Sequence, residues 1–363
     1  MKLVRVIIRR LLLWSNIFLA TTLLFSFFLT FTDPAVFWPA GFAGLPFIYL
    51  WPACFLFIPL WIFYRRRYWL ISLPALLLTL PGVGASWGFH TTGAALPPGP
   101  ASFTVMTFNC SSMGLLRYKT DTGRLQRMYE ELEKASPDIL CLQEFFTNSG
   151  TRAPNHLDSI RRKLKYDHYY FVNHYTNWQN WHYGTIIFSR FPLVDTAAID
   201  LQNVSPEEKM ITARLVVHGD TVRLLSAHLA SQNLQKNEYT VVTAPNKDQA
   251  HGVMKKMKAA FGLRSMQAQL IRREIAATRE PLIVLGDFND VPVSYTYKTI
   301  RGGLQDAFLA QGSGLGRTFS AVAPHLRIDY ILPGPHFTVE DFFIYRRKGF
   351  EHFPIMARLS LKP

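Results

Sequence analysis

The sequence is poor in charged side chains and in cysteine. Charged residues make up 18% of its 363 residues, below the roughly 25% of typical soluble proteins, while 49% are apolar. This composition excludes a disordered chain, a collagen and a coiled coil. Three cysteines are too few for a disulfide-stabilised scaffold. The length suits a domain of about 250 residues with an additional module, rather than one ordinary domain.

Charge is scarcest in the first hundred residues. Residues 1–100 contain seven basic side chains and one acid, Asp33, for a net charge of +6, whereas residues 101–363 contain 32 basic and 24 acidic side chains, for a net charge of +8. From Leu11 to Tyr64, Asp33 is the only charged residue. We therefore predict a hydrophobic N-terminal module joined to an ordinary, mildly basic globular domain.

The N-terminal module contains three apolar segments that are long enough to cross a membrane, which takes about 20 apolar residues. They cover approximately residues 11–31, 43–64 and 68–87. Asp33-Pro34 ends the first segment and Arg65–Arg67 ends the second, while prolines and glycines weaken the third. A cleaved signal peptide is the alternative for the first segment. That alternative is disfavoured because further apolar segments follow and because the segment exceeds the usual apolar stretch of about 7–15 residues.

The basic residues predict the orientation of these spans, because lysine and arginine are enriched on the cytoplasmic side. One basic cluster precedes the first span, and Arg65–Arg67 lie between the second and the third. Three spans with both clusters inside place everything after residue 87 outside the cytoplasm, in the periplasm or the extracellular space. Residues 91–101, rich in proline and glycine, are predicted to form a linker to a domain at 102–363.

In the globular domain, short apolar segments with β-propensity end in polar residues. The polar residues that follow these segments are Asn109, Glu144, His228, Asp287 and Asn289, and His352 precedes the last strand. Asp329 lies inside an apolar segment, where a buried carboxylate needs a partner. Each of these residues taken alone has an ordinary interpretation as a turn or surface residue. Together they predict a group of side chains that converge at one end of a sheet.

Two further patterns concern local structure. The apolar segments 211–217 and 222–227 flank Gly219-Asp220, which is typical of a hairpin turn. Residues 252–279 are basic and carry apolar residues at helical spacing, so we predict an amphipathic helix there.

Taken in order, the motifs resemble the endonuclease/exonuclease/phosphatase superfamily, which has the deoxyribonuclease-I-like fold, over residues 102–363. The matching pieces are Met106-Thr-Phe-Asn-Cys110, Asp138-Ile-Leu-Cys-Leu-Gln-Glu144, Tyr183-Gly-Thr-Ile-Ile-Phe-Ser189, Ser226-Ala-His-Leu229, Gly286-Asp-Phe-Asn-Asp290, Arg327-Ile-Asp-Tyr330 and Glu351-His352. The resemblance implies an α/β (α+β) four-layer sandwich, with two mixed β-sheets flanked by helices, preceded here by three transmembrane helices. It also implies a hydrolase that cleaves phosphodiesters or phosphomonoesters with a divalent cation, usually Mg²⁺ or Mn²⁺.

The resemblance assigns the metal ligands. It makes Glu144 the metal-binding carboxylate, with Asn109 beside it, and hard oxygen ligands of this kind suit Mg²⁺. Glu351 stands where the family usually has an aspartate that contributes to metal binding, and Ser111 stands where it often has another aspartate. Both departures favour one metal over two and leave the ligand role of Glu351 open.

The resemblance also assigns the catalytic residues. His352 matches the general base that activates the attacking water, and Asp329 matches its buried partner. Such a carboxylate fixes the imidazole tautomer and raises its basicity. Asp287 and Asn289 would hold the nucleophile and a phosphoryl oxygen, and His228 would donate to the phosphate as charge builds.

The cysteines have no predicted catalytic part. In the family fold Cys110 and Cys141 lie on neighbouring strands, and a shared metal at Asn109 and Glu144 offsets them by about 10 Å along the strands. Bridged cysteines need Cα atoms within roughly 7 Å, so we expect free, buried thiols.

The substrate is left with three hypotheses. A membrane tether favours phosphate esters near the bilayer, such as lipid head groups, and Trp178, Trp181, His182 and Tyr183 would form an aromatic lip or simply pack in the sheet. The net charge of the domain favours an extracellular or periplasmic endonuclease or exonuclease acting on DNA or RNA. A non-catalytic, membrane-anchored binding module is the third hypothesis, and the complete acid–base set argues against it. The bilayer is the one further partner expected, and no obligate protein partner is inferred.

Overall fold

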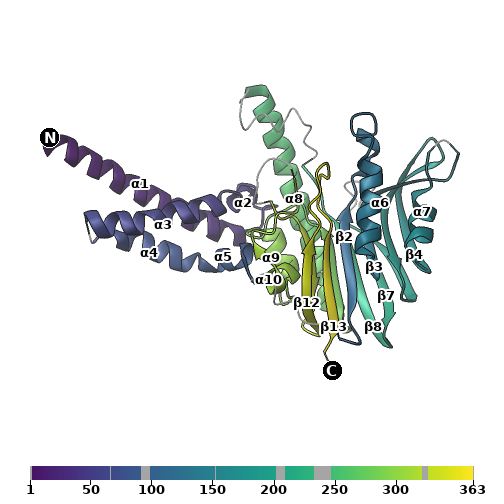
Figure 1. Ribbon diagram of the computed structural model, residues 1–363. Coiled ribbons are helices and arrows are strands. Elements are labelled where there is room, and N and C mark those ends of the chain that lie inside the picture. The colour runs from purple at the N-terminus through teal and green to yellow at the C-terminus, as the bar shows by residue number, and fades with distance from the viewer. Residues whose placement is uncertain are drawn as a thin grey trace.

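The computed structural model describes residues 2–65, 67–90, 99–151, 153–201, 209–232, 247–320 and 326–362. A bundle of N-terminal helices extends from one side of a globular part that contains all the long strands (Figure 1). The predicted linker at 91–101 falls mostly on residues 91–98, which lie outside the described ranges, so it stays a prediction.

The N-terminal part consists of helices joined by short turns. Its elements are α1 (Lys2–Phe28), the 3₁₀ helix η1 (Leu29–Phe31), α2 (Ala40–Ala43), α3 (Phe47–Tyr64), α4 (Trp69–Leu78) and α5 (Leu80–Ser86). Two described segments, Leu3–Phe31 and Phe47–Tyr64, are long and apolar enough to cross a membrane. The third predicted span is a bent pair: α4 and α5 meet at an angle of 53°, as in a broken span or a re-entrant segment.

The helices α1, α3 and α4 pack side by side (Figure 1). Large apolar side chains lie on the outer faces of this bundle. Exposed examples are Trp14, Phe18, Leu56 and Phe63. Inside the bundle, the Ser72 hydroxyl donates to Asn16 Oδ1 at 2.6 Å, and both residues are buried. An apolar exterior with a polar pair between helices is the arrangement that transmembrane bundles show.

Two mixed β-sheets form the centre of the globular part. The first has the strand order β12-β13-β2-β3-β5-β4, and the second has the order β11-β9-β8-β7-β6. The pairs β2–β3 and β8–β9 are parallel and the other pairs are antiparallel. The first sheet contains β2 (Phe103–Asn109), β3 (Ile139–Asn148), β4 (His168–Asn177), β5 (Trp181–Ser189), β12 (Phe337–Ile344) and β13 (Ile355–Leu361); the second contains β6 (Leu193–Asp200), β7 (Lys209–Val217), β8 (Asp220–His228), β9 (Leu282–Asp287) and β11 (Asp329–Pro333).

Helices cover the outer face of each sheet. The helices α6 (Arg124–Ala135) and α7 (His156–Lys163) bury Met128, Leu132 and Ile160 against the first sheet. The helices α8 (Lys247–Ala277) and α9 (Tyr295–Arg301) bury Ile271 and Ile300 against the second. Figure 1 also labels α10 (Ala307–Gln311), and the short strands β1 (Gly88–Phe89) and β10 (Ser313–Gly314) pair with each other. The predicted four-layer sandwich is therefore confirmed.

The apolar segments of the sequence are explained by burial on both faces. In β2, Phe103 and Val105 face the second sheet, while Met106 and Phe108 face the helices on the outer side. A strand that is buried on both faces reads as a continuous apolar run instead of an alternating one.

One local prediction was wrong by one residue. The hairpin between β7 and β8 turns at His218-Gly219, and Asp220 already pairs with Val217. A two-residue turn of this kind requires positive φ at both central residues. His218 and Gly219 have φ values of 53° and 100°, whereas Asp220 continues the strand.

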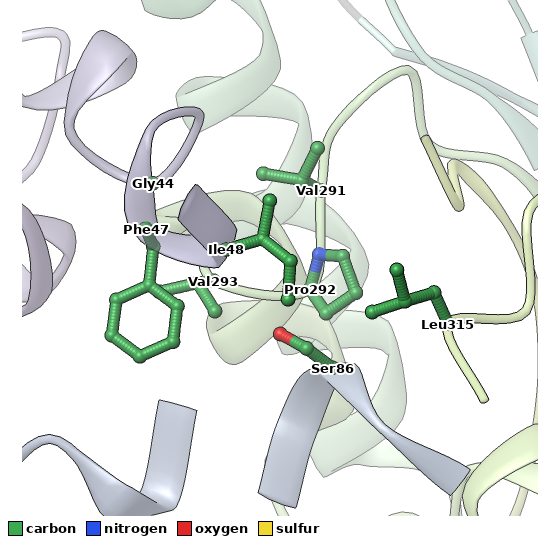
Figure 2. A pocket seen from close by; sticks show the side chains of 8 residues that line it. All are labelled: Gly44, Phe47, Ile48, Ser86, Val291, Pro292, Val293 and Leu315. Carbon is green, nitrogen blue, oxygen red and sulfur yellow. The ribbon is translucent and has the colours of Figure 1, made fainter. Parts of the chain in front are cut away.

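The N-terminal helices pack directly on the globular domain. Arg327, which is 1% exposed, donates to the Ala85 carbonyl at the end of α5 at 2.7 Å. Gly44 lies so close to the 291–293 loop that a Cβ there would be 1.5 Å from the Val293 carbonyl oxygen. The apolar cavity between these parts, lined by the residues in Figure 2, has a volume of about 20 Å³, which is room for about one water molecule. The interface is therefore closely packed and leaves no room for a ligand at this point.

Candidate active site between the two sheets

The core-facing rows of side chains in both sheets change from apolar to polar at the same end. In β2 the row runs Phe103, Val105, Thr107, Asn109, and in β8 it runs Val222, Leu224, Ser226, His228. The row of β9 ends in Asp287, and β11 begins at its partner, Asp329. Because neighbouring strands bring these ends together, the predicted residues meet where the two sheets face each other.

A polar layer separates the apolar core from these residues. The Gln143 amide nitrogen donates to the Thr107 hydroxyl at 2.9 Å and to the Ser226 hydroxyl of the opposite sheet at 3.3 Å. All three residues are fully buried. These bonds tie the two sheets together directly beneath the site, and thereby fix the spacing between its two walls.

A β-bulge aims Glu144 at the site. The register between β3 and β5 shifts between Leu142 and Phe145, and Glu144 has a φ of 47°. Glu144 is the one exposed residue of a strand that is otherwise buried. Bulges next to active sites re-aim side chains, and a positive φ at a non-glycine residue is costly enough to point to a functional requirement.

Asn109 bridges two carboxylates. Its amide nitrogen donates to Glu144 Oε1 at 2.9 Å and to Asp287 Oδ2 at 3.0 Å. Its carbonyl oxygen accepts from the backbone amide of Ser111 at 3.0 Å. In this orientation Asn109 holds the two carboxylates together, and its predicted part in binding a metal stays a prediction.

Asp329 and His352 form a buried pair. Nδ1 of His352 lies 3.2 Å from both carboxylate oxygens of Asp329 and 3.6 Å from Asp287 Oδ2. Asp329 is 2% exposed and His352 is 6% exposed. With Nδ1 directed at the carboxylate, Nε2 is the ring nitrogen left to exchange a proton with a substrate. The Phe319 ring packs edge-on against this imidazole at 4.9 Å.

The charges around His352 stabilise its protonated form. Burial alone would lower the pKa of this imidazole, but the negative charges of Asp329 and Asp287 outweigh burial and raise the pKa to about 10. Burial also raises the pKa of Asp329, while its contact with His352 acts in the opposite direction.

Asp287, Asn289 and His228 form the wall of the second sheet. The backbone amide of Asn289 donates to Asp287 Oδ1 at 2.8 Å, and the Asn289 side chain donates to the Leu229 carbonyl at 2.9 Å. Nε2 of His228 lies 3.7 Å from Glu144 Oε1 and 3.8 Å from Asp287 Oδ2. Gly286 is required beside this wall, because a Cβ there would be 1.8 Å from the Ala227 carbonyl oxygen at a φ of 134°.

Glu351 points elsewhere. Its carboxylate pairs with Arg117 at 3.1 Å, and both side chains are about one-third exposed. Glu351 is not part of the cluster of possible metal ligands that the described residues contain. That cluster is Asp287, Asp329 and His352, whose ligand atoms lie within 4.8 Å of one another.

The residues present fit a hard divalent cation. Glu144 and Asp287 both supply a carboxylate oxygen to one Asn109 amide nitrogen, so the two carboxylates lie close together, while Asp329 and His352 are engaged with each other. Carboxylate oxygens are the ligands that Mg²⁺ and Mn²⁺ prefer. Glu144 is partly exposed whereas Asp287 is fully buried, so Glu144 is the carboxylate that solvent and a hydrated ion reach first.

Sequence reasoning missed the supports behind the site. Arg264 of α8 is fully buried, donates to the Ala230 carbonyl at 2.9 Å and lies 3.6 Å from Asp290. Burial raises the pKa of Asp290, and the neighbouring Arg264 lowers it. These residues flank His228 and Asn289, so they hold the second wall from behind. The amphipathic pattern of α8 marks Arg264 only as one basic residue among several.

The aromatic residues of the proposed lip divide into two groups. Trp181 and Tyr183 pack on Phe146 with ring centroids 5.1 Å apart in each case, as the packing interpretation expects. Trp178 is 76% exposed and contacts Trp181 edge-on at 4.9 Å. Trp178 alone therefore offers an open aromatic face.

The cysteines are free and buried, as expected. Burial raises the pKa of the Cys110 thiol to about 12, so at neutral pH the thiol is protonated and unreactive.

Comparison with known proteins agrees with this geometry. The sequence profile described as "Endonuclease/Exonuclease/phosphatase family" matches residues 106–351, and one described as "Domain of unknown function (DUF8431)" matches residues 9–86. No curated protein matches the chain.

Several solved structures are similar. The endonuclease/exonuclease/phosphatase from Beutenbergia cavernae is 19% identical with a TM-score of 0.52, and the alignment covers 72% of each chain. A family protein from Bacteroides thetaiotaomicron is 18% identical with a TM-score of 0.53, covering 73% of this chain and 100% of that one. The human Nocturnin catalytic domain with bound sulfate is 21% identical with a TM-score of 0.52, covering 72% and 94%. At these identities the likeness establishes the fold.

Proposed function

The chain belongs to the Endonuclease/Exonuclease/phosphatase family, and from this we propose that it is a membrane-anchored phosphoesterase that hydrolyses phosphodiester or phosphomonoester bonds with Mg²⁺ or Mn²⁺. One observation carries the proposal: seven polar side chains converge at one end of the space between the two sheets. They are Asn109, Glu144, His228, Asp287, Asn289, Asp329 and His352.

In this proposal each side chain has a chemical role. His352 takes the proton of the attacking water at Nε2, while Asp329 holds Nδ1 and stabilises the imidazolium that results. Asp287 orients the water, and His228 and Asn289 face the phosphate as negative charge develops. A divalent cation held at Glu144 would neutralise the phosphate and make it a better electrophile.

Two features support placing the catalytic domain outside the cytoplasm. The loop after α1, which contains no basic residue, contacts the globular domain: Asp33 accepts a hydrogen bond from Gln269 at 2.8 Å. The basic residues Arg65 and Arg67 lie at the other end of the bundle, between α3 and α4, on the same side as the N-terminus (Figure 1). With basic residues on the cytoplasmic side, the domain lies on the opposite side.

The test is a panel of phosphoester substrates offered to the full-length protein with Mg²⁺ or Mn²⁺. It contains a chromogenic diester and monoester, phospholipid vesicles, DNA and RNA. We expect cation-dependent hydrolysis that disappears with a chelator and in His352→Ala.

The panel also separates the substrate hypotheses. Turnover of vesicles without cleavage of DNA identifies a lipid head group, and cleavage of DNA or RNA identifies the nuclease. If a correctly folded protein binds a substrate but hydrolyses no ester, the result contradicts the proposed hydrolase and favours the hypothesis of a non-catalytic binding module.

A further inference from the structure

The helix α8 runs across the direction of α1 and α3, at the end of the bundle that meets the globular domain (Figure 1). It has 31 residues and is therefore about 46 Å long. Only its C-terminal half, with Ala268 and Ile271, is buried against the second sheet. The N-terminal half projects beyond the sheet (Figure 1). If α1 and α3 cross a bilayer, α8 lies along the bilayer surface.

One face of α8 contacts the loop that follows α1. The Ser265 hydroxyl donates to Asp33, the Phe261 ring contacts Phe42 at 4.7 Å, and Lys258 Nζ lies 5.6 Å from the Trp38 ring. Positions 258, 261 and 265 are three and four residues apart, so they share one face of the helix. This face is turned toward the end of the helical bundle.

The same face continues into the projecting half of α8. Helical spacing places Met254 in line with Lys258, and Lys255 at its side. Met254 is 45% exposed, and Lys255 and Lys258 are exposed as well. Residues 251–273 contain no acid. In the loop that this face contacts, Val36 is 85% exposed and Phe37 is 46% exposed, which adds apolar surface to the loop.

We propose that the N-terminal half of α8 lies on the membrane surface and binds anionic phospholipid head groups through Lys255 and Lys258. Met254 enters the boundary between head groups and acyl chains. A helix with a basic and apolar face, continuous with membrane-spanning helices, is suited to an anionic lipid surface. This proposal rests on the membrane placement in the proposed function, but not on the hydrolytic activity.

The geometry favours lipid over nucleic acid as the occupant of this face. A nucleic acid needs open access to a basic surface, whereas this face is turned toward the bundle that enters the bilayer. The exposed side chains of Val36, Phe37 and Met254 offer nothing to a phosphate backbone. They match the apolar interior of a lipid leaflet.

The proposal also places the active site close to the bilayer surface. On another face of α8, Arg264 contacts Ala230 and Asp290, next to His228 and Asn289. Arg264 lies six residues beyond Lys258, or about 9 Å along the helix, so the second wall of the site lies near the proposed lipid surface.

The experiment places a fluorescent probe on α8 in the full-length protein. Met254→Cys is labelled with an environment-sensitive dye, since the three natural cysteines are buried. The protein is reconstituted in nanodiscs of phosphatidylcholine, alone or with phosphatidylglycerol, and lipids with a doxyl quencher report contact. We expect a blue shift of the dye emission and quenching by the doxyl lipid, and both should increase with the fraction of phosphatidylglycerol. A probe at Val194→Cys, on the exposed edge strand β6, should not respond.

Charge variants test the lysines. One lysine near an anionic surface contributes a factor of about five to the equilibrium constant for binding that surface. Lys255→Gln with Lys258→Gln should therefore lower the equilibrium constant for docking of α8 on anionic lipid about 30-fold. The matched control removes two exposed charges from α7 by Arg161→Gln with Arg162→Gln and should leave the signal unchanged.

The outcomes are distinct. If the protein has entered the nanodisc but the emission and quenching of the probe do not change with lipid charge, the proposal is overturned. The proposed hydrolase is not affected by that result. A response to duplex DNA that requires the two lysines, in place of the response to lipid, also overturns it and assigns the face to nucleic acid. A protein that does not enter nanodiscs overturns the membrane placement together with this proposal.

Discussion

The pairing of Asp329 with His352 makes a quantitative prediction. The carboxylate contacts Nδ1 at 3.2 Å in a site where both residues are almost fully buried, so the two groups form one functional unit. Removing the base with His352→Ala should lower kcat/KM by about 10²–10⁴-fold, the usual contribution of a general base. Asp329→Asn keeps the size of the side chain but loses the charge, so it should slow hydrolysis as well.

The double variant decides whether the two residues act together. Once His352 is gone, Asp329 has no imidazole to orient, so the double variant should be little slower than His352→Ala alone. The assay is kcat/KM on a chromogenic phosphodiester, with thermal unfolding to show that each variant folds. If the two losses multiply, the pair is not a catalytic unit, and His228 becomes the next candidate for the base.

The pH profile gives an independent measurement. A general base must be neutral, so activity rises with pH through the pKa of His352. The negative charge of Asp329 raises that pKa because it stabilises the imidazolium. Asp329→Asn removes this charge, so the pKa falls and the rising limb of the profile moves to lower pH. A limb that stays in place, or moves to higher pH, would contradict the electrostatic part of the argument.

Three further predictions concern other parts of the molecule. Glu144→Gln should keep the fold and weaken Mg²⁺ or Mn²⁺ binding in calorimetry, because it removes the most accessible carboxylate; unchanged affinity would exclude Glu144 as a ligand. A reporter that is active only outside the cytoplasm should work when fused after Pro363, and activity of a cytoplasm-only reporter there would refute the orientation. Arg327→Met leaves Asp306, its buried partner at 2.6 Å, without a counter-charge and should destabilise the protein by about 3–5 kcal/mol. Lys163→Met breaks an exposed pair with Glu133 and should cost less than about 1 kcal/mol in the same denaturation assay, and equal losses would show that burial of the Arg327 pair is not decisive.

Much of the site could be predicted because its residues end apolar strands. A core-facing row keeps its side chains two residues apart, so a polar residue at the next position of the row must lie at the mouth between the sheets. Asn109, His228 and Asp287 follow this rule. The same rule applied to Gln143 and Ser226 would have indicated the polar layer below them, which the motif comparison passed over.

Other features leave no trace in the sequence. The bulge at Glu144 depends on a positive φ, which glutamate rarely adopts, and no local sequence pattern predicts that conformation. The orientation of the Asn109 amide depends on Glu144 and Asp287, which lie far away in the chain. The strands β4 and β6 lie at sheet edges and are largely exposed, so polar residues interrupt their short apolar segments.

The contacts between the helical bundle and the catalytic domain change how the anchor is understood. Asp33 binds Ser265, the neighbour of Arg264, which supports the second wall of the site. Arg327 binds the end of α5 and lies two residues before Asp329. An anchor that served only to retain the enzyme at the membrane would need neither contact, because a flexible linker would be enough. Contacts this close to the proposed catalytic residues instead fix the direction of the site relative to the helical bundle. If the bundle crosses a bilayer as proposed, this packing would hold the site at a fixed height above the bilayer and would select substrates by that height.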